Sequence, residues 1–198
     1  MGKRQDLDAV VFDVGNVLLA FDTVGYLWRT VGEPEASRIQ RGIFESPHWI
    51  ELDRGVLTLA EIGARMVADA PEMAAWVAHI PRMHQEVIAE MTDSTAYLPR
   101  LKEAGYALYV LSNFGGALFA ETRARYDFFS LFDGQLISGD EQIVKPEPHI
   151  YRELLARFAL DPARTLFIDD RPENIEAALA LGMQGMVFTH ASQLDTLI

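Results

Sequence analysis

Four short apolar segments of this chain each lead into polar residues, and this recurring pattern constrains the fold more than any other feature of the sequence. The first segment, Ala9–Phe12, leads into Asp13-Val14-Gly15-Asn16. In chain order, the other three lead into Ser112-Asn113, Lys145-Pro146 and Asp169-Asp170. Continuous apolar runs of this kind are typical of parallel strands that are buried on both faces. Ligands bind beyond the carboxyl ends of such strands, so the four polar ends predict one shared pocket.

Strand-like and helix-like segments alternate from about residue 92 onward. Together with the segment before Asp13, they predict five strands, at 9–12, 106–111, 135–138, 165–168 and 184–188. They also predict four helices, at 99–104, 115–126, 146–159 and 172–182. Alternation of this kind is typical of βαβ units. We therefore expect an α/β fold with a Rossmann-like parallel five-stranded sheet flanked by helices.

The long interval from about residue 18 to residue 91 shows no convincing strand pattern. Leu59, Ile62 and Met66 recur at helical spacing, and prolines at 34, 47, 71 and 81 divide the segment. We expect a small helical cap here, inserted after the first strand and lying above the carboxyl edge of the sheet. This predicts a core domain of residues 1–17 and 92–198 and a cap domain of residues 18–91.

The charge and cysteine content limit the classes of partner. The chain carries 29 acidic and 17 basic residues, which gives a net charge of −12 with neutral histidines. Because no Lys/Arg cluster offsets this charge, neither a nucleic acid nor a membrane is expected as a partner.

No segment resembles a signal peptide or a membrane span. The chain has no cysteine for a thiolate nucleophile or a metal ligand, which suits a reducing compartment. The cytoplasm is therefore the expected location, and the oligomeric state is left open.

The four polar strand ends resemble, in this order, the signature motifs of the haloacid dehalogenase superfamily of hydrolases. These motifs are Asp13 after a strand, Ser112 at the next strand end, Lys145 before a proline and the pair Asp169-Asp170. The segments Phe-Asp-Val-Gly-Asn-Val and Phe-Ile-Asp-Asp-Arg-Pro-Glu-Asn-Ile-Glu look closest to one branch of the family. That branch holds α-glucose-1-phosphate phosphatases and the phosphatase domains of epoxide hydrolases. The resemblance implies a Mg²⁺-dependent phosphatase whose substrate is a small phosphorylated metabolite, with a sugar phosphate preferred.

The chemistry of phosphate esters explains why these residue types belong together. A phosphate ester and a carboxylate nucleophile are both anionic, so their reaction needs a divalent cation and a fixed ammonium group. Asp13 and Asp170 offer the oxygen ligands that Mg²⁺ prefers. Lys145 offers the ammonium, which would bridge the nucleophile and the phosphoryl oxygens. By resemblance, Asp13 would form an aspartyl-phosphate that water hydrolyses, with Lys145 and Ser112 as the other catalytic residues.

The resemblance also assigns roles to the remaining positions. The carbonyl of Gly15 would be a further ligand of Mg²⁺, and Asp169 would act on the metal through a water molecule. Asn174 would orient Asp170 or Lys145 from behind. The metal site would thus consist of Asp13, Gly15, Asp169 and Asp170. The residues that bind the phosphoryl group, with side chains or backbone N–H groups, would be Gly15, Asn16, Ser112, Asn113 and Lys145.

One position departs from the family pattern. Most phosphatases of the family carry a second Asp two residues after the nucleophile, as general acid and base, and this chain has Gly15 there. General acid catalysis is worth about 10²–10⁴-fold in rate. Either a water or another residue supplies it, with Asp22 and Asp53 as candidates, or the substrate has a leaving group of low basicity. The second option favours phosphates on an anomeric carbon and acyl phosphates over alkyl phosphates.

Two other functions stay open. A 2-haloacid dehalogenase also uses an Asp nucleophile, but it needs no metal, and Asp169-Asp170 argues against it. A non-catalytic binding or regulatory module that keeps the fold is suggested only by Gly15.

The polar segments also have structural interpretations, such as Ser112-Asn113 capping a helix. Trp49 is the tryptophan to test as a sugar-stacking surface, with packing inside the cap as the main alternative. The five histidines show no ligand spacing, so we interpret them as surface or hydrogen-bonded residues.

Overall fold

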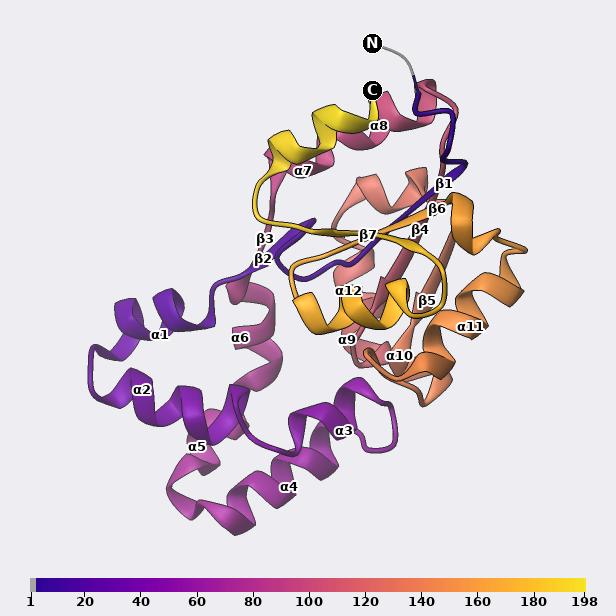
Figure 1. Ribbon diagram of the computed structural model, residues 1–198. Coiled ribbons are helices and arrows are strands. Elements are labelled where there is room, and N and C mark those ends of the chain that lie inside the picture. Colours follow the sequence, from indigo (N-terminus) through magenta and orange to yellow (C-terminus); the bar gives the residue numbers. More distant parts are fainter. Residues whose placement is uncertain (1–2) are drawn as a thin grey trace.

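A parallel sheet of five strands forms the centre of the computed structural model, which describes residues 3–198 (Figure 1). The strands are β1 (Ala9–Phe12), β4 (Ala107–Ser112), β5 (Gly134–Ile137), β6 (Thr165–Asp169) and β7 (Gln184–Val187). Their order across the sheet is β5-β4-β1-β6-β7, and every neighbouring pair is parallel. The predicted fold class and its five strands are therefore confirmed.

Strand β1 lies in the middle of the sheet, which explains its continuous apolar sequence. It pairs with β4 on one side and with β6 on the other, and all four of its residues are buried. Asp13 follows directly and donates its backbone N–H to the carbonyl of Ile168 in β6 at 2.9 Å. Because the three strands run in the same direction, their carboxyl ends lie at one edge of the sheet. This topology brings Asp13, Ser112 and Asp169 together.

Helices cover both faces of the sheet. The helical segments of this part are α7 (Thr92–Thr95), α8 (Tyr97–Glu103), α9 (Gly116–Arg123), η3 (Asp127–Leu131), α10 (Ser138–Glu141), α11 (Pro148–Arg157), η4 (Pro162–Arg164), α12 (Pro172–Leu179) and η5 (Ala191–Leu197). Successive residues of β1 point to opposite faces. Val10 packs in one apolar cluster with Leu98 of α8, and Val11 packs in another with Ile150 of α11 and Ile175 of α12. The four predicted helices correspond to α8, α9, α11 and α12.

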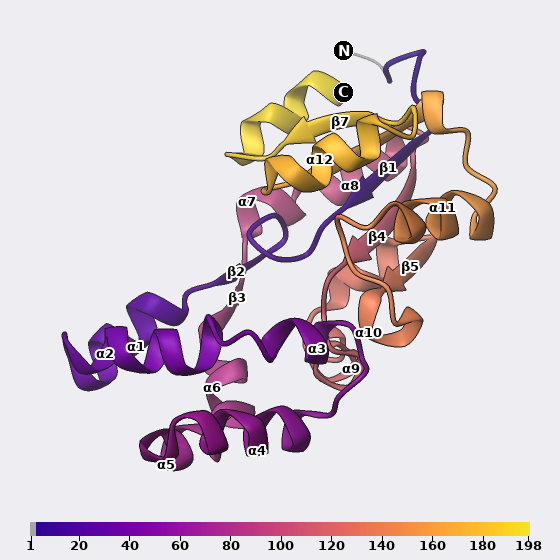
Figure 2. The ribbon, with the colours of Figure 1, turned by 60° about the horizontal axis from the view of Figure 1, so that its bottom comes forward.

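A second group of helices lies between β1 and β4 in the sequence. These cap helices are α1 (Thr23–Val31), α2 (Glu35–Ile39), η1 (Gln40–Phe44), α3 (Trp49–Asp53), α4 (Leu59–Asp69), η2 (Pro71–Met73), α5 (Ala74–Val77) and α6 (Ile80–Val87). Figure 2 shows them as a group beside the sheet, with α3 nearest to α9 and α10.

The expectation that residues 18–91 contain no strand is wrong. β2 (Leu19–Phe21) and β3 (Ile88–Glu90) form an antiparallel pair where the chain leaves the sheet and where it returns. Each strand has only three residues, too few to show the alternation by which a strand is recognised in a sequence. The pair joins the cap helices to the rest of the molecule.

The turn formed by Asp53, Arg54 and Gly55 is a second connection between the cap helices and the sheet side, which is the part of the molecule that contains the five-stranded sheet and its helices. Arg54 makes a bidentate ion pair with Glu147, with N–O distances of 3.0 and 2.5 Å. The hydroxyl of Ser138, the first residue of α10, donates to the backbone carbonyl of Asp53. Gly55 has a φ of +73° and lies directly against the backbone of Gly139. These contacts fix the end of α3 over the carboxyl edge of the sheet.

Replacing Gly55 by Ala should disturb this connection. A Cβ at residue 55 would lie 2.0 Å from the carbonyl oxygen of Gly139, and the positive φ adds strain for any L side chain. We expect a loss of about 3 kcal/mol in the free energy of unfolding, measured with urea. Gly105→Ala is the matched control, because Gly105 also has a positive φ, of +90°, but no atom within 4 Å of its Cβ position. It should cost only about 1 kcal/mol. Equal losses in the two variants would show that the contact with Gly139 is unimportant.

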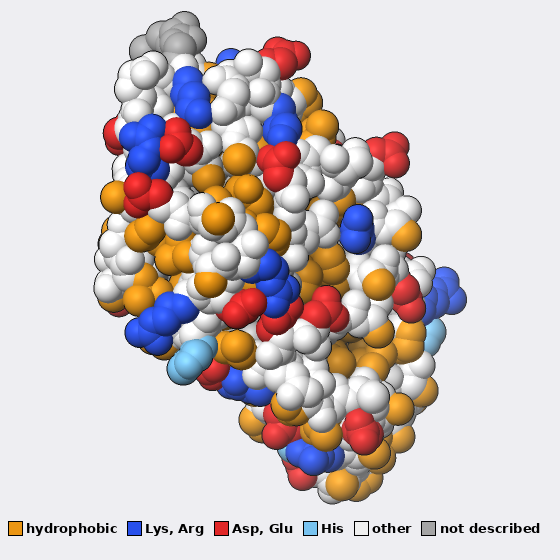
Figure 3. Space-filling view, turned by 90° about the vertical axis from the view of Figure 1, so that its right-hand side faces the viewer, with side chains coloured by type: hydrophobic (Ala, Val, Ile, Leu, Met, Phe, Trp, Pro, Cys, Tyr) orange, Lys and Arg blue, Asp and Glu red, His pale blue; other side chains and the backbone are white. Residues whose placement is uncertain are grey.

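The surface carries charges of both signs. Figure 3 shows one face on which basic and acidic side chains are interspersed. Exposed ion pairs include those of Arg157 with Glu141 and Glu153. Among the described residues, no helix combines the length and the apolar character needed to cross a bilayer.

Candidate active site

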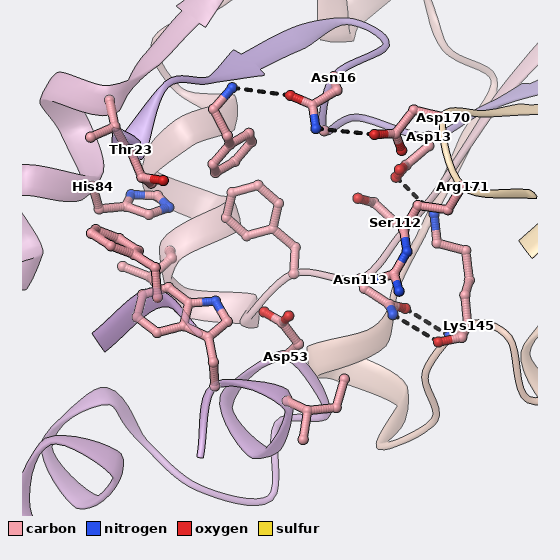
Figure 4. Close-up of a pocket in the computed structure, with 18 of the residues that line it drawn as sticks. Asp13, Asn16, Thr23, Asp53, His84, Ser112, Asn113, Lys145, Asp170 and Arg171 are labelled. Atoms are coloured by element: carbon pink, nitrogen blue, oxygen red, sulfur yellow. Dashed lines mark hydrogen bonds and ion pairs between the residues drawn. The ribbon is translucent and has the colours of Figure 1, made fainter. Parts of the chain in front are cut away.

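A cavity of about 340 Å³ lies between the carboxyl edge of the sheet and the cap helices. From the sheet side it is lined by nearly all of the site residues predicted from the sequence: Asp13, Gly15, Asn16, Ser112, Asn113, Lys145, Asp170 and Asn174. Asp169 is fully buried and is not among the residues that line the cavity. Figure 4 shows Asp13, Ser112 and Asp170 on one side of the cavity, with Thr23 and His84 opposite. The polar strand ends therefore share one pocket.

A buried ammonium group holds two carboxylates together at this edge. Lys145 Nζ lies 2.8 Å from Asp13 Oδ1 and 2.6 Å from Asp169 Oδ2. The three side chains are almost fully buried, with exposed fractions of 1%, 10% and 0%. Burial alone would lower the pKa of Lys145, but the charges of Asp13 and Asp169 outweigh burial and raise that pKa. Lys145 therefore stays protonated at neutral pH.

The carboxyl group of Asp13 is held in a fixed orientation. Its Oδ1 accepts the backbone N–H of Val14 at 2.7 Å and lies 2.8 Å from the ammonium nitrogen of Lys145. Burial raises the pKa of Asp13 to about 6, against the charge of Lys145, which lowers it. The carboxylate is thus less stable here than in water. A further cation beside it would favour the charged, nucleophilic form.

Three carboxylates form a cluster with the composition of a cation site. Oxygen atoms of Asp13, Asp169 and Asp170 lie within 4.8 Å of one another. Three carboxylates and the single ammonium of Lys145 leave two negative charges, which suits a divalent cation with oxygen ligands. Asp13 and Asp170 line the cavity, and the residues present therefore fit Mg²⁺.

Asp169 has a different environment from Asp170. Its Oδ2 accepts from Lys145 Nζ, its Oδ1 accepts the backbone N–H of Arg171 at 2.9 Å, and both oxygens lie 3.0 Å from Asn174 Nδ2. Its oxygens are thus occupied by protein donors. Asp170 is half-buried, and its Oδ2 accepts from Asn16 Nδ2 at 3.1 Å. The structure therefore favours Asp13 and Asp170 as direct ligands, with Asp169 as the counterion of Lys145.

Three predicted residues make contacts other than those expected. Asn174 binds Asp169 and not Asp170 or Lys145, because it lies in the first turn of α12, directly above the end of β6. The Asn113 side chain bonds the backbone N–H and carbonyl of Lys145 at 2.7 and 2.9 Å, so it fixes the lysine loop. Asn16 uses its side chain on Asp170, and its backbone N–H donates to Leu19. The backbone N–H of Asn16, which was expected to bind the phosphoryl group, is therefore already used in a hydrogen bond within the protein.

The opposite side of the cavity is largely aromatic. It is lined by Phe21, Phe44, Trp49, Ile50, His84, Val87, Phe114 and Leu118, together with the polar residues Thr23 and Gln40. Burial lowers the pKa of His84 to about 4, so this imidazole is neutral at physiological pH. Its ring packs edge-on against Phe21 and Phe114. His84 could not be predicted as a cavity residue from the sequence, because a lone histidine in a helix has no ligand spacing.

The structure separates the two candidate replacements for the missing acid. Asp22 is exposed, caps α1 by accepting the N–H of Gly25 at 2.9 Å, and pairs with Arg29. It does not line the cavity. Asp53 is half-buried, and its carboxyl group faces the cavity (Figure 4).

Comparisons with known proteins identify the family of this chain. A sequence profile described as haloacid dehalogenase-like hydrolase matches residues 7–182. A sesquiterpene phosphatase, astK of Aspergillus oryzae, is 28% identical over 186 residues, which covers 91% of this chain and 89% of the relative.

Solved structures share the fold. The haloacid dehalogenase family enzyme bt-2542 of Bacteroides thetaiotaomicron superposes with a TM-score of 0.76 at 20% identity, covering 96% of this chain and 99% of that one. It has also been crystallised with magnesium and inorganic phosphate. L-2-haloacid dehalogenase of Xanthobacter autotrophicus gives a TM-score of 0.69 at 16% identity, and the match covers 90% of this chain and 76% of that one. With the profile match spanning most of the sequence, this chain belongs to the haloacid dehalogenase-like hydrolase family.

Proposed function

We propose that this hydrolase is a Mg²⁺-dependent phosphatase that cleaves a small phosphate monoester through an aspartyl-phosphate on Asp13. The observation that carries the proposal is the buried contact of Lys145 with Asp13, beside the cavity-lining carboxylate of Asp170. A haloacid dehalogenase reaction uses no metal and gains nothing from this acidic cluster. Phosphoryl transfer needs both a nucleophile and concentrated positive charge.

In the proposed reaction, each step has its own residue. A carboxylate oxygen of Asp13 attacks phosphorus, and the bond from phosphorus to the alcohol oxygen breaks. The ammonium of Lys145 and the hydroxyl of Ser112, both next to Asp13, would contact the phosphoryl oxygens as negative charge builds up on them. When bound by Asp13, Asp170 and the carbonyl of Gly15, Mg²⁺ would supply further positive charge against the repulsion between carboxylate and phosphate. Water then cleaves the aspartyl-phosphate and releases phosphate.

The alcohol part of the substrate would occupy the aromatic side of the cavity. The sequence analysis favours a sugar phosphate as the substrate, and this stays a prediction. Trp49 supports it, because Trp49 lines the cavity and aromatic rings stack on sugar faces. The number of apolar side chains at this end favours a second candidate, the phosphate of an apolar alcohol. The similarity to a sesquiterpene phosphatase supports the same candidate. Relative kcat/KM values for sugar, prenyl and aryl phosphates decide between the two.

Metal binding gives a direct test of the proposal. Mg²⁺ at a hundredfold excess over its dissociation constant should stabilise the folded chain by about 2.7 kcal/mol. A thermal-shift titration of metal-free protein should show this stabilisation, and Asp170→Asn should reduce it strongly. Asp93→Asn, an exposed Asp on α7, is the control and should respond like the original protein. Aryl phosphatase activity should disappear with chelator and return with Mg²⁺. A full response in Asp170→Asn, or activity without metal, would refute the assignment.

A further inference from the structure

The cavity contains one acidic residue that the proposed reaction does not yet use. Of the three carboxyl groups that line it, Asp13 is the proposed nucleophile and Asp170 the proposed metal ligand. The third is Asp53, which lies at the end of α3. The reaction still needs a group that protonates the leaving alcohol, because Gly15 occupies the position where the family usually has an acid. The neutral His84 has a pKa of about 4, which makes it a poor proton donor at neutral pH.

We propose that Asp53 is the general acid and base of this phosphatase, supplied from the cap helices in place of the missing residue. This inference rests on the proposed function. In the first step, the carboxyl group of Asp53 gives its proton to the alcohol oxygen as the bond from phosphorus to that oxygen breaks. In the second step, the Asp53 carboxylate takes a proton from water while the water oxygen bonds to phosphorus. The bond from phosphorus to Asp13 then breaks, which restores both carboxyl groups to their starting states.

The position of Asp53 is fixed by several contacts with the sheet side of the molecule. Its backbone carbonyl accepts from the hydroxyl of Ser138, the first residue of α10. The adjacent Arg54 is paired with Glu147. Figure 4 shows the carboxyl group directed into the cavity, between the aromatic side and Asn113. A catalytic group needs such a fixed position, because proton transfer requires hydrogen-bond distance to the reacting oxygen.

The electrostatic environment of Asp53 also suits both roles. Burial raises the pKa of Asp53 to about 7, with a further increase from Asp13 and opposing effects of Gly115 and Lys145. Arg54 is neutralised by Glu147, and on the same helix Glu51 is paired with Arg65. A group with a pKa near the working pH can both give and accept a proton. This agrees with the geometric argument.

Substrates with different leaving groups test the inference. p-Nitrophenyl phosphate releases a weakly basic phenolate that needs little protonation, whereas an alkyl phosphate releases a strongly basic alkoxide. Asp53→Asn should lower kcat for the alkyl phosphate by about 10²–10⁴-fold. For the aryl phosphate the change should be small, so the dependence of log kcat on leaving-group pKa should become steeper. Asp53→Glu, which keeps a carboxyl group, should restore part of the alkyl activity.

The matched control is Glu51→Gln, which removes the same charge from the same helix outside the cavity and should leave both rates unchanged. Equal losses on both substrates in Asp53→Asn, with the fold retained by circular dichroism, would mean that Asp53 only positions the cap. No loss on either substrate would equally overturn the inference. Neither result affects the proposed function, which is tested separately by the activity of Asp13→Asn on the aryl phosphate and by the requirement for Mg²⁺.

Discussion

Replacing Asp13 by Asn is expected to lower aryl phosphatase activity by about 10⁴-fold or more while leaving the protein folded. An amide oxygen is a poor nucleophile, so no aspartyl-phosphate can form. The aryl leaving group needs no acid, and the loss therefore reports on the nucleophile alone. The measurement is kcat with p-nitrophenyl phosphate at saturating Mg²⁺.

Stability data for the same variant provide the control. The pKa of Asp13, at about 6, lies above the ordinary value of 3.8, chiefly because the side chain is buried. Asp13 therefore stabilises the fold below pH 3.8, and this contribution is lost as the pH rises through about 6. Lys145 keeps its contact with Asp169 in the variant. At pH 7.5, Asp13→Asn should thus unfold at a urea concentration no lower than that of the original protein. Loss of activity through unfolding would invalidate the first prediction.

Replacing Lys145 by Met should damage both stability and activity. Without the ammonium, the carboxylates of Asp13 and Asp169 remain buried beside each other with no counterion. Breaking a buried ion pair in this way costs about 3–5 kcal/mol. Loss of a preorganised positive group should also lower kcat by about 10²–10³-fold or more. Urea unfolding and kcat on the aryl phosphate measure the two effects.

The pH dependence of the Lys145→Met variant follows from Asp13. Without the charge of Lys145, which lowers the pKa of Asp13, that pKa rises further above its value in the unfolded chain. The variant should therefore be more destabilised at pH 8 than at pH 5, where Asp13 becomes protonated. Lys102→Met is the matched control, because Lys102 pairs with Asp133 at 2.7 Å but is one third exposed. It should cost about 1 kcal/mol or less at either pH. A Lys145 variant as stable as this control would contradict the buried-triad interpretation.

The sheet could be predicted from the sequence because its strands are buried on both faces and therefore read as continuous apolar runs. The antiparallel pair of β2 and β3 could not be predicted, because three residues on each strand are too few to show an alternation of apolar and polar residues. The positions of Asp13, Ser112 and Asp169 follow from topology alone: three neighbouring parallel strands must end at the same edge. The central part of the site could therefore be predicted from the sequence.

The contacts around these residues depend on tertiary packing, which no local pattern encodes. The sequence could not decide that Asn174 binds Asp169 or that Asn113 holds the Lys145 loop. Asp22 and Asp53 were equivalent candidates in the sequence, and only the docking of the Asp53 turn on the sheet side separates them. The aromatic side of the cavity could not be predicted either, because its residues come from β2, from the cap helices and from the segment after β4.

The proposed mechanism requires that Asp13 accepts the phosphoryl group. A rapid acid quench during turnover of an aryl phosphate, followed by mass spectrometry of the digested protein, tests this most directly. A phosphoryl group is expected on the peptide that contains Asp13, present in the original protein and absent from Asp13→Asn. A phosphoryl group on any other residue, or full turnover by Asp13→Asn, would rule out Asp13 as the nucleophile.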